Sequence, residues 1–223
     1  MGIISGDGQG SRATRGSRPV AALEPRGDRD SLGEAERHYA DAVRRFIGAM
    51  KIRSAVELDC GDYRVGRRIA RRNLEYVGFD ADLSLLERNR QRYGGRHVRF
   101  VAGDVIGDDL PDGELCLAGE VLRRLTNAEI RLLLLKFKKF KYVIFNEYMP
   151  RLGEFTPNLD KPPGRLDRLD RGSALLLQHP PFNVRCVEYF LISPLDNHSD
   201  LRLCSFLIRM QDQATRLDPV YLD

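Results

Sequence analysis

The sequence predicts a single α/β domain of three layers, in which helices cover both faces of a mostly parallel β-sheet. Its 223 residues make one large domain or two very small ones at roughly 100–200 residues per domain. Short apolar segments alternate with helical patterns between 54 and 148, which is typical of consecutive β-α-β units. Near the end, apolar segments at 185–193 and 201–210 are joined by a connection too short for a parallel crossover, so we expect an antiparallel hairpin.

The two ends of the chain differ in composition from its middle. Residues 1–30 are rich in Gly, Ser, Arg and Pro, which predicts a disordered or flexible arm. Ordered structure is expected to begin at Ser31, because Ser31 and Glu34 have the spacing of a helix capping box. The domain is therefore expected over 31–212, with a C-terminal tail at 213–223.

Local patterns predict the elements of the sheet in order. Helices are expected at 65–73, at 83–93 after the capping residue Asp82, and after Thr126, which has capping-box spacing to Glu129. Strands buried on both faces read as short apolar runs. Five such runs are expected to pair in parallel: 54–59, 74–80, 97–103, 114–120 and 142–148.

The segment 150–182 departs from this alternation. It contains Pro157, Pro162 and Pro163 together with several Gly and Asp residues. Connections of this length inside a domain are usually functional. We expect a lid or substrate loop, with a short helix at 173–178.

Composition and cysteine usage exclude several classes of protein. No apolar run reaches the ~18–20 residues that span a bilayer, and the N-terminus lacks the apolar core of a secretory signal. The four cysteines form no CxxC pair, which argues against a metal site and a disulfide framework. The net charge of +4 is too small to indicate a nucleic-acid partner. We expect a soluble, cytoplasmic monomer or homodimer that binds a small molecule and no membrane.

Three acidic residues mark the edge of the sheet where ligands bind, beyond the carboxyl ends of the strands. Glu57 closes the first strand, and the following loop contains Gly61, which lets backbone approach a ligand closely. The second strand ends in Asp80, about 20 residues later, where an acid accepts hydrogen bonds from ribose hydroxyls. Asp104 adds an acceptor after the third strand.

Four segments stand in order along these strand ends: VELDCGDYRVGRRIA, YVGFDADLSLLERNR, VRFVAGDV and ELCLAGEVLRRL. Together they resemble the successive motifs of class I S-adenosylmethionine-dependent methyltransferases, over about Ser54 to Tyr148. The resemblance implies a Rossmann-like, seven-stranded sheet that ends in an antiparallel hairpin. It also implies an enzyme that uses S-adenosylmethionine as cofactor and releases S-adenosylhomocysteine.

The resemblance further implies which residues bind the cofactor. Glu57 matches the acid that commonly interacts with the methionine end, and Asp80 matches the ribose-binding acid. Ala81, Asp104 and Val105 match the surroundings of the adenine. The full expected set is Glu57, Asp59, Cys60, Gly61, Asp80, Ala81, Asp104, Val105, Glu120 and Val121.

The first loop departs from the family pattern at two positions that are usually glycine, here Asp59 and Tyr63. The side chain of Asp59 is expected to point toward the path of the cofactor, where its charge costs desolvation free energy unless it is paired. Asp59 either pairs with the ammonium or sulfonium group of the cofactor, or it obstructs binding.

The methyl acceptor is predicted only in outline. A hydroxyl acceptor needs a base, and Glu147 and His179 are candidate catalytic residues because both are expected at the carboxyl edge of the sheet. Since no RNA-binding module is appended, we expect O-methylation of a small molecule, such as a sugar or a secondary metabolite. Two alternatives are a catalytically inactive binding or scaffold protein with this fold, and an RNA or protein methyltransferase.

Overall fold

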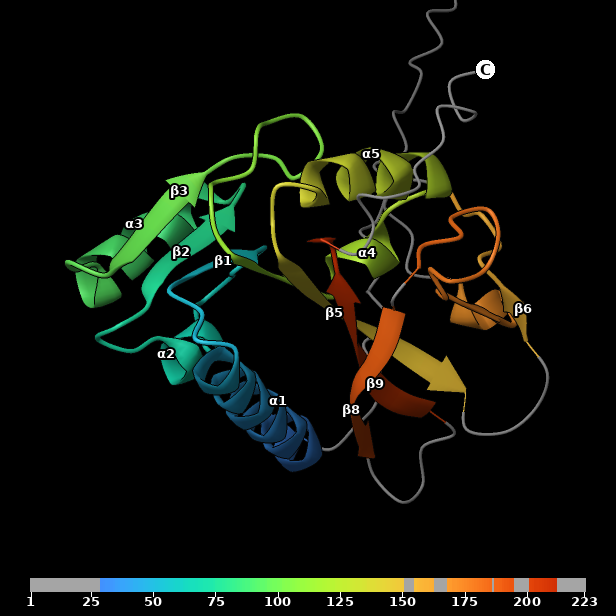
Figure 1. Cartoon of the computed structure of the whole chain (residues 1–223), viewed down its shortest axis with the longest axis horizontal. Coiled ribbons are helices and arrows are strands. Elements are labelled where there is room, and N and C mark those ends of the chain that lie inside the picture. Colours follow the sequence, from blue (N-terminus) through green and yellow to red (C-terminus); the bar gives the residue numbers. More distant parts are fainter. Residues whose placement is uncertain (1–28, 151–154, 163–167, 186, 195–200, 212–223) are drawn as a thin grey trace, which may run out of the picture.

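A computed structural model describes residues 29–150, 155–162, 168–185, 187–194 and 201–211 (Figure 1). The expected N-terminal arm lies outside these residues up to position 28, and the C-terminal tail lies outside them entirely. Within the described ranges, no helix is long and apolar enough to cross a membrane. The same ranges contain no cluster of His, Cys, Asp and Glu that could hold a metal ion.

A seven-stranded sheet runs through the centre of the molecule in the order β3-β2-β1-β4-β5-β9-β8. The strands from β1 to β5 pair in parallel, and β9 is antiparallel to both of its neighbours. The strand order reverses between β1 and β4, which places a ligand-binding crevice at their carboxyl ends. The predicted sheet is confirmed, with strands β1 (Ser54–Leu58), β2 (Glu75–Asp80), β3 (Val98–Ala102), β4 (Leu115–Gly119), β5 (Tyr142–Pro150), β8 (Val187–Pro194) and β9 (Leu201–Arg209).

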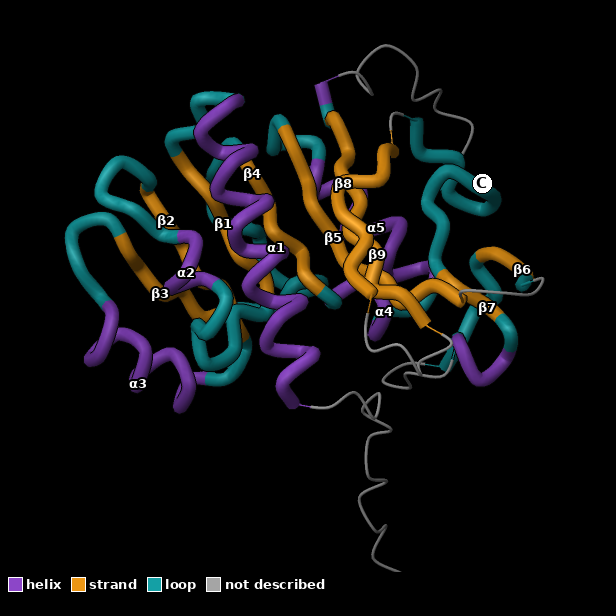
Figure 2. The backbone as a smooth tube through the Cα atoms, turned by 90° about the horizontal axis from the view of Figure 1, so that it is seen from below, coloured by secondary structure: helices purple, strands orange, loops and turns teal. Residues whose placement is uncertain are grey.

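Helices cover both faces of the sheet, and Figure 2 shows the long N-terminal helix crossing in front of the strands. Successive strand residues face opposite layers: Ala55 packs with one hydrophobic cluster and Val56 with the other. The first cluster includes the apolar face of α1, and the second includes that of α5. One layer consists of α1 (Arg29–Ala49), α2 (Gly66–Ile69) and α3 (Leu83–Tyr93), and the other of α4 (Val121–Arg124) and α5 (Asn127–Phe137).

Two of the predicted helix caps are confirmed, because they depend on local hydrogen bonds. Asp82 accepts hydrogen bonds from the backbone N–H groups of Ser84 and Leu85 at 2.9 and 3.0 Å. Thr126 and Glu129 form the reciprocal capping box at the start of α5. These caps satisfy N–H groups that have no partner within the helix.

Three local predictions are wrong. Ser31 lies inside α1, which already runs at Arg29, whereas an N-cap residue has a non-helical backbone. The helix expected at 65–73 is the single turn α2, since it has no side-chain cap and Ala70 turns to an extended backbone. The helix expected at 173–178 is absent: β7 (Ser173–Ala174) pairs with β6 (Thr156–Pro157), and a turn follows at 177–178.

The insertion after β5, which includes the 3-10 turn η1 (Leu169–Arg171), is anchored to α4 by two buried cations. Lys161 Nζ donates to the backbone carbonyl of Arg124 at 2.7 Å. The Arg168 guanidinium donates to the carbonyl of Leu125 at 2.8 Å and to Asn127 Oδ1 at 3.0 Å. The last carbonyls of a helix have no partner within the helix. The insertion therefore fixes the end of α4.

Replacing Arg168 with Met should lower the free energy of unfolding by about 3 kcal/mol, because several buried acceptors lose their donor at once. Chemical denaturation of the full chain measures this loss. The control is Arg171→Met in the same insertion: Arg171 is exposed and donates to one carbonyl, so we expect a loss below about 1 kcal/mol. Equal losses in the two variants would contradict an anchoring role for Arg168.

Candidate functional site

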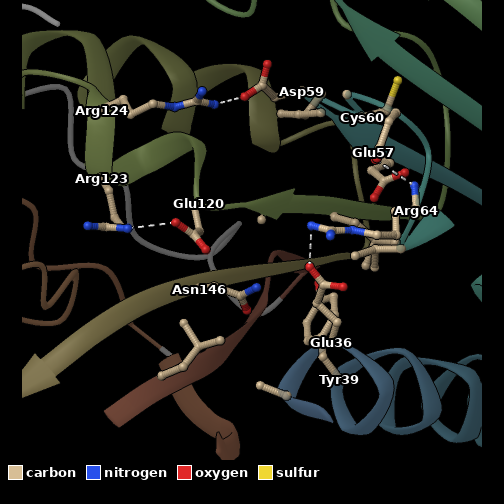
Figure 3. Close-up of a pocket in the computed structure, with 18 of the residues that line it drawn as sticks. Glu36, Tyr39, Glu57, Asp59, Cys60, Arg64, Glu120, Arg123, Arg124 and Asn146 are labelled. Atoms are coloured by element: carbon tan, nitrogen blue, oxygen red, sulfur yellow. Dashed lines mark hydrogen bonds and ion pairs between the residues drawn. The ribbon is translucent and has the colours of Figure 1, made fainter. Parts of the chain in front are cut away.

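A cavity of about 440 Å³ opens at the carboxyl ends of β1, β4 and β5. Residues of α1, of the loop after β1 and of α4 complete its walls (Figure 3). This is the place beyond the strand ends, at the reversal of strand order, where sheets of this type bind ligands. Its polar lining consists of Glu36, Tyr39, Glu57, Asp59, Asp62, Arg64, Glu120, Arg123, Arg124, Asn146 and Tyr148.

Hydrogen bonds hold the loop after β1 against β2 and α3. The backbone N–H of Gly61 donates to Asp80 Oδ2 at 2.8 Å, and Asn89 Nδ2 donates to the Gly61 carbonyl at 2.7 Å. Gly61 has a positive φ of 51°, which glycine adopts without steric strain. The other oxygen of Asp80 accepts from the N–H of Asp82 at 2.9 Å. Asp80 therefore shapes the loop in addition to standing at the predicted ribose position.

Glu57 is partly buried in the cavity wall at the end of β1. Tyr76 donates its hydroxyl hydrogen bond to Glu57 Oε2 at 2.9 Å. Burial raises the pKa of Glu57 to about 8, although the hydrogen bond from Tyr76 acts in the opposite direction. Among the described residues, no Lys, Arg or His forms an ion pair with Glu57. The cavity therefore offers a carboxyl group whose ionised form a cationic ligand would stabilise.

Tyr63, at the second departure from the family loop, fills the core beneath the loop. Its ring packs against Tyr76, Tyr93 and Phe100, with centroids 5.0–5.6 Å apart. A Cβ atom added to Gly66 would overlap both the Tyr63 ring and Glu57 Oε2. Glycine at 66 thus allows the tyrosine and the acid to approach the start of α2 closely. The aromatic side chain at 63 does not line the cavity.

Asp59 has a partner within the protein. It adopts a φ of 55°, a backbone region that non-glycine residues rarely occupy and that Asp tolerates better than most. Its carboxylate forms an ion pair with the guanidinium of Arg124 in α4 (Figure 3). Both residues line the cavity. The charge of Asp59 is therefore compensated before any ligand binds.

A second arginine of α4, Arg123, is held more firmly. It pairs with Glu120 at 2.7 Å, and its guanidinium carbon lies 4.3 Å above the centre of the Tyr148 ring, a cation–π contact. Arg123 Nε also lies 3.8 Å from Glu147 Oε1. Burial raises the pKa of Glu147 to about 7, and the charge of Arg123 opposes this rise.

Two buried polar atoms of the cavity wall have no hydrogen-bond partner among the described residues: Tyr39 Oη and Asn146 Oδ1. Tyr39 is 6% exposed and Asn146 is 8% exposed. A buried polar atom without a partner costs about 1–3 kcal/mol. Both residues line the cavity, and neither atom has its hydrogen bond supplied by the described part of the protein.

The structure brings half of the predicted cofactor residues together in the cavity wall, namely Glu57, Asp59, Cys60, Gly61 and Glu120. Val121 is buried in the core below α4. Asp104 accepts hydrogen bonds from the N–H groups of Ile106 and Gly107, so it also caps a turn. The predicted residues outside the lining are Asp80, Ala81, Asp104, Val105 and Val121.

Neither predicted catalytic residue lines the cavity. Side chains alternate along a strand, and Asn146 and Tyr148, the two neighbours of Glu147 in β5, line the cavity in its place. His179 is exposed in the turn before β8. Glu36 and Arg64, which form an ion pair at 2.7 Å in the wall, were not predicted, because they are far apart in sequence.

The structure is similar to those of several methyltransferases, whereas no protein-family model and no curated protein sequence matches the chain. N-methyltransferase NodS from Bradyrhizobium japonicum WM9 aligns with a TM-score of 0.56 and 13% identity, over 81% of this chain and 98% of that chain. The N-terminal domain of EvdMO1, solved in the presence of S-adenosylhomocysteine and D-fucose, aligns with a TM-score of 0.52 and 13% identity, over 76% and 82%. Human N-acetylserotonin methyltransferase, in complex with S-adenosylmethionine, aligns with a TM-score of 0.51 and 13% identity, over 81% and 54%. The chain therefore has the class I methyltransferase fold.

The raised pKa of Glu57 predicts that the stability difference between the wild type and Glu57→Gln depends on pH. The folded protein keeps a proton on Glu57 up to a pH of about 8, whereas the unfolded chain releases it above the ordinary value of 4.5. Stability is therefore lost as the pH rises between these two values. The glutamine side chain of Glu57→Gln is uncharged at every pH. The free energy of unfolding of this variant should therefore rise by up to a few kcal/mol relative to that of the wild type as the pH increases from 5 to 8.

Chemical denaturation of both proteins at the two pH values measures this difference. Glu188→Gln is a suitable control, because Glu188 is exposed on β8, away from the cavity lining. If the free energies of unfolding of Glu57→Gln and the wild type differ by the same amount at both pH values, Glu57 is ionised in the folded protein and the prediction fails.

Proposed function

We propose that this chain, which has the fold of the class I S-adenosylmethionine-dependent methyltransferases, transfers a methyl group from that cofactor to a hydroxyl group of a small molecule. A sugar or a secondary metabolite is the proposed acceptor. The observation that carries the proposal is Glu57, a partly buried carboxyl in the cavity wall with no cation of the described residues paired to it. A ligand with an ammonium group supplies the missing charge.

The residues present fit the cofactor in charge and in hydrogen-bonding groups. Glu57 would hold its ammonium group, and the backbone of the loop through Gly61 would border its methionine part. Asp80 would accept hydrogen bonds from the ribose, with Asp104 and Val105 beside the adenine. When bound, the cofactor supplies a methyl group that a sulfonium leaving group activates.

The remaining residues of the cavity are assigned to the acceptor. Tyr39 and Asn146 would hydrogen-bond it through their unpartnered atoms, which aligns it and excludes water. Glu120, which the resemblance places among the cofactor residues, lines the cavity at the end of β4. We propose for it instead the role of the base that takes the hydroxyl proton. Glu147 lies outside the lining, so we assign it the positioning of Arg123. His179, the other predicted catalytic residue, lies in an exposed turn outside the lining, and we assign it no step of the transfer.

The small-molecule acceptor is supported by the size of the cavity, which is within the usual range for small-molecule sites. It is also supported by the EvdMO1 domain, which has a similar fold and was solved in the presence of a sugar. A screen of hydroxylated sugars and metabolites would identify the acceptor.

A second candidate function is a catalytically inactive binding or scaffold protein with the same fold. The ion pair between Asp59 and Arg124 favours it, because a charged side chain stands where the family loop usually has glycine. This alternative predicts that the wild-type protein binds neither S-adenosylmethionine nor S-adenosylhomocysteine. Cofactor binding thus separates the two functions.

S-adenosylhomocysteine should raise the melting temperature of the full chain, because a ligand of the folded state stabilises it by mass action. At 100 times the dissociation constant the gain is about 2.7 kcal/mol, or about 5 °C or more for a domain of this size. Asp80→Ala should abolish the shift, since it removes both the ribose acceptor and the partner of Gly61.

The control for this experiment is Asp112→Ala, which removes an exposed acid outside the cavity lining and should leave the shift unchanged. A wild-type protein that shows no shift at high ligand concentration would contradict the methyltransferase proposal and favour the scaffold protein.

Glu120→Gln should reduce methyl transfer to a hydroxyl acceptor by about 100-fold or more, the usual effect of removing a general base. Radiolabelled methyl transfer to the acceptor found in the screen measures the rate. S-adenosylhomocysteine should still raise the melting temperature of the variant, which separates loss of chemistry from loss of cofactor binding. A variant with the wild-type rate would show that Glu120 is not the base.

A further inference from the structure

Glu57 and Arg124 bring an acid and a cation to the wall of one cavity. Glu57 stands at the end of β1, and Arg124 reaches the wall from α4 to pair with Asp59, two residues beyond Glu57 (Figure 3). An α-amino acid group carries one ammonium and one carboxylate. Arg124 has the charge that recognises the carboxylate, and Glu57 gains the charge that recognises the ammonium when a bound cation favours its ionised form.

The ion pair between Arg124 and Asp59 is of a kind that exchanges readily. The Arg124 side chain is 46% exposed and that of Asp59 is 37% exposed. Partly exposed pairs are screened by water and contribute little to stability. A ligand carboxylate that approaches Arg124 can form a charge-assisted pair with the guanidinium in place of Asp59. Exchange therefore replaces one weak pair with another and leaves no buried charge unpaired.

The backbone beneath Arg124 is fixed while its side chain remains partly exposed. The buried ammonium of Lys161 donates to the Arg124 carbonyl at 2.7 Å. Arg123, its neighbour in α4, is only 10% exposed and is held by Glu120 and the Tyr148 ring. Of the two arginines of α4, Arg124 is the one that can change partner.

We propose that Arg124 binds the carboxylate of the cofactor's methionine part by exchanging Asp59 for it, while Glu57 binds the ammonium group. This inference rests on the proposed function. Asp59 then competes with the ligand for Arg124, and after the exchange its charge repels the ligand carboxylate. Asp59 thereby lowers the affinity only for adenosyl ligands that carry a carboxylate.

The test compares two ligands that differ in this one group, S-adenosylmethionine and decarboxylated S-adenosylmethionine, by titration calorimetry on the full chain. Arg124→Gln should lower the affinity for S-adenosylmethionine about 10-fold, because the variant loses a charge-assisted hydrogen bond to the ligand. The same variant should change the affinity for the decarboxylated ligand by no more than about 2-fold, since that ligand has no group for Arg124.

Asp59→Asn tests the competition directly, since Asn keeps the size of Asp and tolerates the same backbone. It should strengthen the binding of S-adenosylmethionine by about 3-fold or more, because Arg124 is no longer neutralised. It should not strengthen the binding of the decarboxylated ligand, which has only cationic groups to offer Arg124. The double variant Asp59→Asn/Arg124→Gln should bind S-adenosylmethionine more tightly than Arg124→Gln does, because the charge of Asp59 no longer repels the ligand carboxylate, and less tightly than Asp59→Asn does.

Arg64→Gln is the matched control, because Arg64 is also a cavity arginine paired with one carboxylate, that of Glu36. It should affect both ligands equally. The inference is overturned if Arg124→Gln lowers the affinity for both ligands equally or for neither. It is also overturned if Arg64→Gln, instead of Arg124→Gln, lowers the affinity for S-adenosylmethionine alone. If neither the wild type nor Asp59→Asn binds either ligand, the proposed function fails and the inference fails with it.

Discussion

The carboxyl group of Glu57 stands partly buried at the end of β1 without a positive partner among the described residues, and the site is built around it. Tyr76 supports it with one hydrogen bond, and the missing side chain of Gly66 lets it lie against the start of α2. Two other acids of the wall, Glu36 and Asp59, already form ion pairs with arginines. A bound cation is therefore what the cavity lacks.

The rest of the fold positions the two arginines that share the cavity wall with this acid. The turn α4 follows directly on β4 and carries Arg123 and Arg124 into the wall. Its last carbonyls are held by Lys161 and Arg168 from the insertion after β5. Because buried cations of one segment fix the backbone of another, the insertion shapes the cavity while those two cations stay outside its lining.

The sequence predicted what depends on neighbouring residues and missed what depends on tertiary contacts. Strand positions follow from apolar alternation, and the cap at Asp82 requires only the next three residues. The helix expected at 173–178 was wrong, because the pairing of β7 with β6 is decided by residues outside that segment. Glu57 could be found from its place at a strand end. The partner of Asp59 could not, because Arg124 is brought to it only when β1 and β4 lie side by side.

The release of protons on ligand binding tests most directly whether Glu57 binds the ammonium group of the cofactor. At pH 7 the free protein keeps Glu57 protonated, since its pKa is about 8, and a bound cation favours the ionised form. Calorimetric titration with S-adenosylhomocysteine in buffers of different ionisation enthalpy should therefore show release of about one proton per ligand bound, and Glu57→Gln should show none. Binding to the wild type without proton release would contradict the account.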